Sequence, residues 1–229
     1  MEIKGNYTIT FMEKPYVLNY AAVVGQKEGE GPLKNYFDII NEDSLFGEQT
    51  FEKAETKLQQ TAINEALKKA GLESQDIDAV FSGDLLNQCI GSSFAMRGTD
   101  VPFIGVYGAC STMALTIGLA SVFVSAGAAK KAIAVTSSHF CAAERQYRFP
   151  LEYGNQRTPT AQWTVTGSGA VILSQEKTNV LIDKAIFGTV NDLGVTDANN
   201  MGAAMAPDDV KIRPYPTHEG MVFFYTQIQ

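Results

Sequence analysis

A mixed α/β fold with a β-sheet around a buried central helix is predicted by three features of the sequence. A helical run at Ser111–Ser125 is apolar on nearly every side, so it should have neighbours all round it. Strand-like apolar segments precede and follow it, at Phe103–Tyr107 and Lys131–Ser137. A strand, a helix and a strand in that order predict parallel strands covered by helices. With 229 residues, 45% hydrophobic and 19% charged, the chain can bury such a core.

The elements before the central helix follow from apolar spacing and from residues that break structure. A strand is predicted at Tyr16–Val24, within an otherwise irregular first part of the chain. Thr50–Ala70 predicts an amphipathic helix that ends at Gly71. Ala79–Ser82 predicts a short buried strand. The apolar face of the helix consists of Ala54, Leu58, Ala62, Ile63, Ala66, Leu67 and Ala70. Its polar face is expected to carry Lys53, Glu55, Lys57, Gln60, Asn64 and Lys68.

Two further strands are predicted after the central unit, at Gly169–Ser174 and Val180–Gly188. Only the short segment Gln175–Asn179 separates them. That spacing predicts an antiparallel, hairpin-like pair of neighbours.

Composition excludes several classes of protein. The net charge of −7 argues against nucleic acid as a partner, because phosphate binding depends on clustered Lys and Arg, and the sequence has no strongly basic cluster. The three cysteines, Cys89, Cys110 and Cys141, have no disulfide-framework spacing, and no apolar signal segment precedes them. We therefore expect a cytoplasmic chain in a reducing compartment.

The segment from Val101 to Ala129 contains no charged residue and is long enough to suggest a membrane span. Pro102, Gly105 and Gly108 interrupt its first part, and serine and threonine hydroxyls are scattered through the rest. These interruptions favour a buried core over a membrane helix.

Cys110 lies between a predicted buried strand and the first turn of a predicted buried helix. A thiol at a helix N-terminus is near the positive end of the helix dipole and near N–H groups, which favour the thiolate. The same N–H groups can hold an oxyanion or a carboxylate, so Cys110 and Ser111 suit either acyl transfer or anion binding. Alternatively, Cys110 packs as a small hydrophobic residue. Its position alone leaves these alternatives open.

His139, one of two histidines, directly follows the strand predicted at Lys131–Ser137. Ligands of parallel sheets sit at the carboxyl ends of the strands, so His139 and Cys110 are expected at one edge. His139 can activate the thiol there, or it can simply satisfy a local hydrogen bond. His139 and Cys141 are too few ligands for zinc, and we expect neither a metal nor a cofactor.

Arg145, Arg148 and Arg157 concentrate positive charge in an otherwise acidic chain. They can bind carboxylates with two hydrogen bonds each, or they can belong to a solvated loop. Trp163, the only tryptophan, can stack on a flat aromatic ligand or can simply lead into the next strand.

Four segments carry a resemblance to a known family: Phe81–Gln88, Tyr107–Met113, Ser137–Phe140 and Asn199–Pro207. They resemble the stage V sporulation protein AD family, a thiolase-like branch from endospore-forming bacteria. The likeness runs from near the N-terminus to Pro207. It implies binding of pyridine-2,6-dicarboxylic acid (dipicolinic acid) and its movement into the developing spore.

Thiolase-like folds contain two similar halves packed as a layered α/β sandwich. The resemblance implies that residues 1–207 form the N-terminal half, with Cys110 at its nucleophile position. In condensing enzymes the remaining catalytic residues come from the second half, for which 229 residues leave no room. Residues 208–229, with Pro214 and Pro216, do not resemble the family's continuation. We therefore expect a divergent tail on a truncated or frame-shifted chain.

Two classes of function then compete. The first is a non-catalytic binding module for dipicolinic acid, free or as its calcium chelate, held by Cys110, Ser111, His139, the three arginines and Trp163. The second is an acyltransferase that uses Cys110 as its nucleophile. The resemblance also implies other subunits of a sporulation transport complex as partners, and a peripheral location at the inner membrane of the spore. A homodimer is a further expected assembly.

Overall fold

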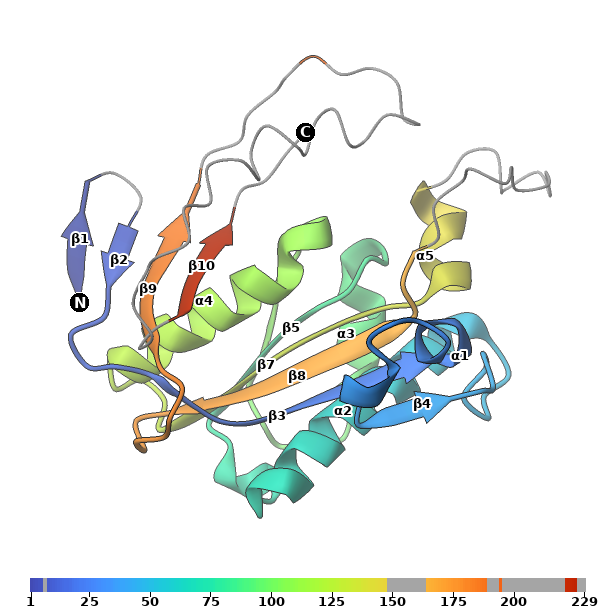
Figure 1. Ribbon diagram of the computed structural model, residues 1–229, viewed down its shortest axis with the longest axis horizontal. Coiled ribbons are helices and arrows are strands. Elements are labelled where there is room, and N and C mark those ends of the chain that lie inside the picture. The colour runs from blue at the N-terminus through green and yellow to red at the C-terminus, as the bar shows by residue number, and fades with distance from the viewer. Residues whose placement is uncertain (6–7, 148–163, 189–193, 195–220, 226–229) are drawn as a thin grey trace.

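The computed structural model describes residues 1–5, 8–147, 164–188, 194 and 221–225, and the structural statements below refer to these residues. They form four layers, visible in Figure 1: helices, a six-stranded sheet, one long helix, and a four-stranded sheet. The structure thus confirms the predicted mixed α/β fold around a central helix.

The six-stranded sheet is mixed. Its strands, in spatial order, are β4 (Ile39–Asn41), β3 (Tyr16–Gly25), β8 (Gly167–Ser174), β7 (Lys131–Ser138), β5 (Ala79–Gly83) and β6 (Phe103–Gly105). β5 pairs in parallel with both β6 and β7, while β8 runs antiparallel to both β3 and β7. The carboxyl ends of β5, β6 and β7 therefore lie at one edge.

The second sheet has the order β1 (Glu2–Lys4), β2 (Thr8–Thr10), β9 (Ile182–Phe187) and β10 (Met221–Tyr225). The predicted hairpin between the strands around 169–174 and 180–188 is wrong, because β8 and β9 belong to different sheets. β10 lies in the segment expected to be a divergent tail, and it pairs in parallel with β9. β9 packs on the central helix, where the ring of Phe187 faces Gly118.

The two longest helices lie on opposite faces of the six-stranded sheet (Figure 1). α2 (Phe51–Ala70) begins at Thr50, whose hydroxyl accepts a hydrogen bond from the Lys53 amide, and ends at Gly71 in the left-handed conformation (φ 66°). α4 (Thr112–Ser125) lies between the two sheets. The shorter helices are α1 (Gln26–Gly29), α3 (Ile90–Ala95), α5 (Phe140–Tyr147) and the 3-10 turns η1 (Lys34–Tyr36), η2 (Ser74–Asp76), η3 (Asn87–Cys89) and η4 (Ala109–Ser111).

Alternate side chains of each central strand fill two separate cores, because successive strand residues point to opposite faces. On the α2 side, Val80 and Ile133 pack against Leu58. On the α4 side, Phe81 packs with Ile117. None of the described helices combines the length and the apolar character that a membrane crossing requires.

Candidate functional site

The carboxyl edge of β5, β6 and β7 carries Cys110 and His139, two of the residues that the sequence singled out for chemistry. Cys110 lies in η4, after β6, and its side chain is exposed. Asp84 directly follows β5, and His139 directly follows β7. We call this region the Cys110 edge.

The backbone beside Cys110 is strained. Ala109 has φ 45°, in the left-handed region that residues with a Cβ rarely adopt. Hydroxyls hold this turn: Ser111 donates to the Gly108 carbonyl at 2.6 Å, and Thr112 donates to the Ala109 carbonyl at 2.8 Å. Ser111 is the N-cap of α4, but its hydroxyl caps none of the helix amides. This helix N-terminus therefore presents partial positive charge beside an exposed thiol.

Gly83 explains how β5 can approach this turn so closely. A Cβ at this position would overlap the Val106 carbonyl oxygen and lie 2.6 Å from the Thr112 methyl carbon. The end of β5 thus lies directly against the loop after β6 and against the first turn of α4. Only glycine leaves room for that contact.

Two thiols and a phenol gather at the Cys110 edge. Burial raises the pKa of the Tyr107 phenol, and the nearby Cys110, Cys89 and Asp84 raise it further. Cys89 donates through its thiol to the Val106 carbonyl at 3.3 Å. Burial also raises the pKa of Cys89, with Asp84 adding to the effect. The protonated thiol is therefore favoured at Cys89, as its donor role requires.

His139 is fully buried, although its strand brings it to the same edge as Cys110. Its Nε2 lies 2.7 Å from the Ser44 carbonyl, and its Nδ1 lies 3.2 Å from the Cys141 amide, which donates to it. These contacts assign the proton to Nε2. The ring also lies against Phe51 and Phe140. Both ring nitrogens thus have partners other than the Cys110 thiol.

A buried polar network, which the sequence did not reveal, lies beneath the edge between α2 and the ends of β5 and β7. Gln59 is its centre: its amide nitrogen donates to Ser92 and to Ser137, each at 3.2 Å. The Gln59 oxygen accepts from Ser82 at 3.1 Å. All four side chains are almost completely buried. The network therefore connects the helix layer to two neighbouring strands.

Two acidic side chains, Asp84 and Glu55, lie at the ends of this network. Asp84 accepts from the Ser92 hydroxyl at 2.6 Å and from two backbone amides, those of Leu86 and Ser92. Glu55 accepts from Ser137 at 3.1 Å. The three hydrogen bonds of Asp84 fasten the loop after β5, which leads directly into Cys89.

Glu55 was expected on the polar face of its helix, and that expectation is wrong, because the side chain is fully buried. Burial raises the pKa of Glu55 to about 8, and the nearby Asp84 and Glu52 act in the same direction. The hydrogen bond from Ser137 opposes this rise. Glu55 is therefore mostly a neutral acid at pH 7. The only sequence signal was its i, i+4 spacing from Gln59, beside the apolar stripe of α2.

The other predicted binding residues fall mainly outside the described part of the chain. Arg148, Arg157 and Trp163 lie outside the described residues, and Arg145 is placed only as part of α5. Within the described residues, no cluster of three or more His, Cys, Asp or Glu side chains is arranged to hold a metal ion.

Comparison with solved structures finds 3-oxoacyl-[acyl-carrier-protein] synthases and a polyketide ketosynthase. One is 3-oxoacyl-[acyl-carrier-protein] synthase III from Aquifex aeolicus, with 14% identity, a TM-score of 0.46, and coverage of 72% of this chain and 55% of that one. Another is the priming β-ketosynthase of the R1128 polyketide pathway, with 15% identity, a TM-score of 0.46, and coverage of 76% and 52%.

Sequence comparison identifies the family. The model of the stage V sporulation protein AD family matches residues 5–214, which extends past Pro207. Stage V sporulation protein AD of Bacillus subtilis is 44% identical over 207 residues, which are 90% of this chain and 61% of the relative. The chain thus spans less than two thirds of that relative's length. It belongs to the stage V sporulation protein AD family, a family of sporulation proteins.

Proposed function

We propose that the chain binds dipicolinic acid at the Cys110 edge, without chemistry, and so contributes to uptake of this compound into the developing spore. The observation that carries the proposal is the N-terminus of α4, which the Ser111 hydroxyl does not cap, beside the exposed Cys110 in a member of a sporulation family. Dipicolinate carries two carboxylates, and a helix N-terminus attracts negative charge.

In this arrangement one carboxylate meets the first turn of α4 at Ser111. Arg145, Arg148 and Arg157 are proposed to hold the second carboxylate, and Trp163 to stack on the pyridine ring. The proposed ligand is free dipicolinate or its calcium chelate. Other subunits of a sporulation transport complex, or a second copy of the chain, are the proposed partners at the spore inner membrane.

A second function, acyl transfer through the Cys110 sulfur, is favoured by one observation. The strained turn at Ala109 exposes the thiol at the start of α4, as a nucleophile requires. His139 argues against it, because both ring nitrogens already have other partners. A base for the thiol would have to come from elsewhere.

Calorimetric titration with dipicolinate, with and without calcium, tests the binding proposal. Ser111→Asp places a carboxylate at the helix N-terminus, where it competes with the ligand, whereas Ser111→Ala adds no charge there. We expect Ser111→Asp to weaken binding by about tenfold, which corresponds to about 1.4 kcal/mol, and Ser111→Ala to have a smaller effect. Equal affinity in both variants would refute the role of the helix N-terminus.

Incubation with acetyl-CoA followed by intact mass measurement tests the second function. Binding without catalysis predicts no acetylated protein, and it predicts that Cys110→Ser still binds dipicolinate. Acetylation that disappears in Cys110→Ser, together with no dipicolinate binding by the unmodified chain, would establish the acyltransferase instead.

A further inference from the structure

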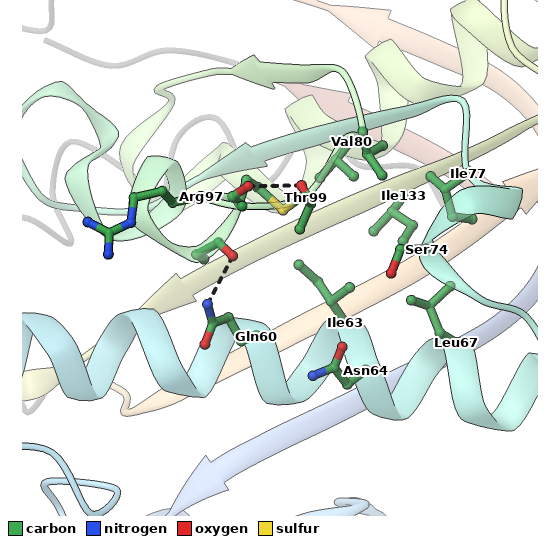
Figure 2. Close-up of a pocket in the computed structure, with 14 residues that line it drawn as sticks. Gln60, Ile63, Asn64, Leu67, Ser74, Ile77, Val80, Arg97, Thr99 and Ile133 are labelled. Atoms are coloured by element: carbon green, nitrogen blue, oxygen red, sulfur yellow. Dashed lines mark hydrogen bonds between the residues drawn. The ribbon is translucent and has the colours of Figure 1, made fainter.

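A hollow of about 280 Å³ lies on the α2 side of the six-stranded sheet, between α2, η2 and the turn that follows α3 (Figure 2). Its floor is aliphatic and consists of buried side chains from both helices and strands: Ile63 and Leu67 of α2, Ile77, Val80 of β5, and Ile133 of β7. Val80 and Ile133 belong to the core on the α2 side, so the hollow reaches down to the sheet itself. We call it the Ile63 hollow.

Two hydrogen bonds hold the wall of the hollow that faces α2. Gln60 donates from α2 to the Ala95 carbonyl at 3.1 Å, which ties the end of α3 to the long helix. The Thr99 hydroxyl donates to the Met96 carbonyl at 2.8 Å and closes the turn after α3. Both bonds are drawn as dashed lines in Figure 2. Because the chain forms these bonds by itself, the hollow exists before any ligand binds, and binding costs less ordering of the protein.

Arg97 is the only charged residue among the described residues that line the Ile63 hollow. Figure 2 shows that its guanidinium points away from the apolar floor. The guanidinium lies instead over the Phe94 ring, 5.6 Å from its centroid. An ionised ligand would therefore lose its hydration in the hollow without gaining a partner of opposite charge, and that loss is expensive. The lining thus selects uncharged ligands.

Ser74 offers a hydrogen-bonding group beside the apolar floor. It lines the hollow from η2, and its hydroxyl forms no hydrogen bond with any residue that the structure describes. In Figure 2 the Ser74 oxygen lies among Leu67, Ile77 and Ile133. A hydroxyl can both donate and accept a hydrogen bond. Its place beside aliphatic side chains suits a ligand that has an apolar body and one polar group.

We propose that the Ile63 hollow binds small phenols and alcohols, which are uncharged molecules with an apolar ring or short chain and one hydroxyl. The apolar body lies against Ile63, Val80 and Ile133, and the hydroxyl forms a hydrogen bond with Ser74. An apolar cavity of about 150 Å³ can hold benzene, so a hollow of about 280 Å³ accommodates a ring with a short substituent. This site goes beyond the proposed function, because it lies on the α2 face of the sheet and uses no residue of the Cys110 edge.

Methyl NMR of the full chain with isotope-labelled isoleucine, titrated with 4-ethylphenol, locates the binding. We expect saturable shifts of the Ile63, Ile77 and Ile133 methyl signals, with a dissociation constant of about 1 mM for so small a ligand. The signals of Ile117 and Ile182, in the core on the α4 side, should not move. 4-Ethylbenzoate is similar in shape but ionised, and it should bind at least about tenfold more weakly. Equal binding of the two compounds, no saturable shifts, or shifts confined to the α4 side would overturn the proposal.

Substitutions in η2 test the contact with Ser74. Ser74→Phe places a ring in the hollow and should weaken 4-ethylphenol binding at least about tenfold. Gln75→Phe is the matched control, because its neighbouring side chain is exposed and does not line the hollow, and it should bind normally. Ser74→Ala should weaken 4-ethylphenol binding about threefold and leave the binding of ethylbenzene, which has no hydroxyl, unchanged. Unchanged 4-ethylphenol affinity in either Ser74 variant would refute the contact. The methyl shifts locate the ligand independently if Ser74→Phe does not fold.

Discussion

The buried acid Glu55 makes the stability of the chain depend on pH, and Glu55→Gln should remove that dependence. Glutamine keeps the oxygen that accepts from Ser137 and cannot ionise. It also places an amide nitrogen where the Glu55 Oε2 has no hydrogen-bond partner among the described residues. Because that nitrogen is buried without a hydrogen-bond acceptor, it lowers the free energy of unfolding by about 1–3 kcal/mol at every pH. The diagnostic quantity is therefore the slope with pH and not the absolute stability.

The size of the effect follows from the two pKa values. Glu55 has a pKa of about 8 in the folded chain and 4.5 ordinarily. Because the folded state holds the proton more tightly, the free energy of unfolding falls as pH rises from 4.5 to 8, and the loss is complete above pH 8. At 1.36 kcal/mol per pKa unit, the whole loss is about 5 kcal/mol. Between about pH 5.5 and 9.5, a range above the pI near 4.9, it is about 3 kcal/mol.

Urea unfolding followed by far-ultraviolet circular dichroism measures this loss. The free energy of unfolding of Glu55→Gln minus that of the unmodified chain should rise by about 3 kcal/mol across that range, because titrating groups that do not interact with Glu55 cancel in the difference. Glu65→Gln is the matched control on the same helix. Glu65 forms an ion pair with the exposed Lys68, and Glu65→Gln should therefore lower the free energy of unfolding by less than about 1 kcal/mol.

One outcome would refute the reasoning. If the stabilities of Glu55→Gln and the unmodified chain run parallel from pH 5.5 to 9.5, Glu55 does not hold a proton in the folded state at neutral pH. The conclusion that Glu55 is a neutral acid in the network beneath the Cys110 edge would then be wrong.

Three other substitutions test the local geometry. Gly83→Ala should destabilise the chain by about 1–3 kcal/mol or more, because the new Cβ overlaps the Val106 carbonyl; urea unfolding measures this, and an unchanged midpoint would contradict the close contact. Asp84→Asn leaves one of the hydrogen bonds to Asp84 without an acceptor, and it should speed hydrogen exchange of the amides in the loop after β5; unchanged protection would contradict the anchoring role. Thr50→Ala should cost about 1 kcal/mol of unfolding free energy while Thr50→Ser costs little, and equal losses would exclude the cap.

Elements with a strong local signal were predicted well. α2 begins one residue after Thr50 and ends before Gly71, because an N-cap hydroxyl and a left-handed glycine act within one turn of the helix. The strands β3, β5 and β7 also match their predicted positions closely. An apolar run bounded by structure-breaking residues is a local signal, so it can be recognised without knowing the rest of the fold.

Pairing between strands was less predictable. The short segment between β8 and β9 suggested a hairpin, yet the chain passes from one sheet to the other. β8 instead pairs with β3 and β7, and both of these strands end many residues before β8 begins. A short connection limits how far apart two strands can be, but it does not decide which partners complete their hydrogen bonds.

The candidate site, too, was only partly predictable from the sequence. The order of strand, turn and helix placed Cys110 and Ser111 at the start of α4 from the sequence alone. The neutral Glu55 and the network around Gln59 required the tertiary structure, since their partners Ser82, Ser92 and Ser137 come from three other elements.

The amino-acid sequence by itself determined the α/β class, the main helices and strands, and a turn at Cys110 between a strand and a helix, because apolar spacing, caps and glycines act over a few residues. Only the tertiary structure decided that His139 is buried against Ser44 and that Glu55 keeps its proton. Each of these depends on desolvation or on charges brought together from distant segments, and burial is a property of the packed layers and not of any one segment.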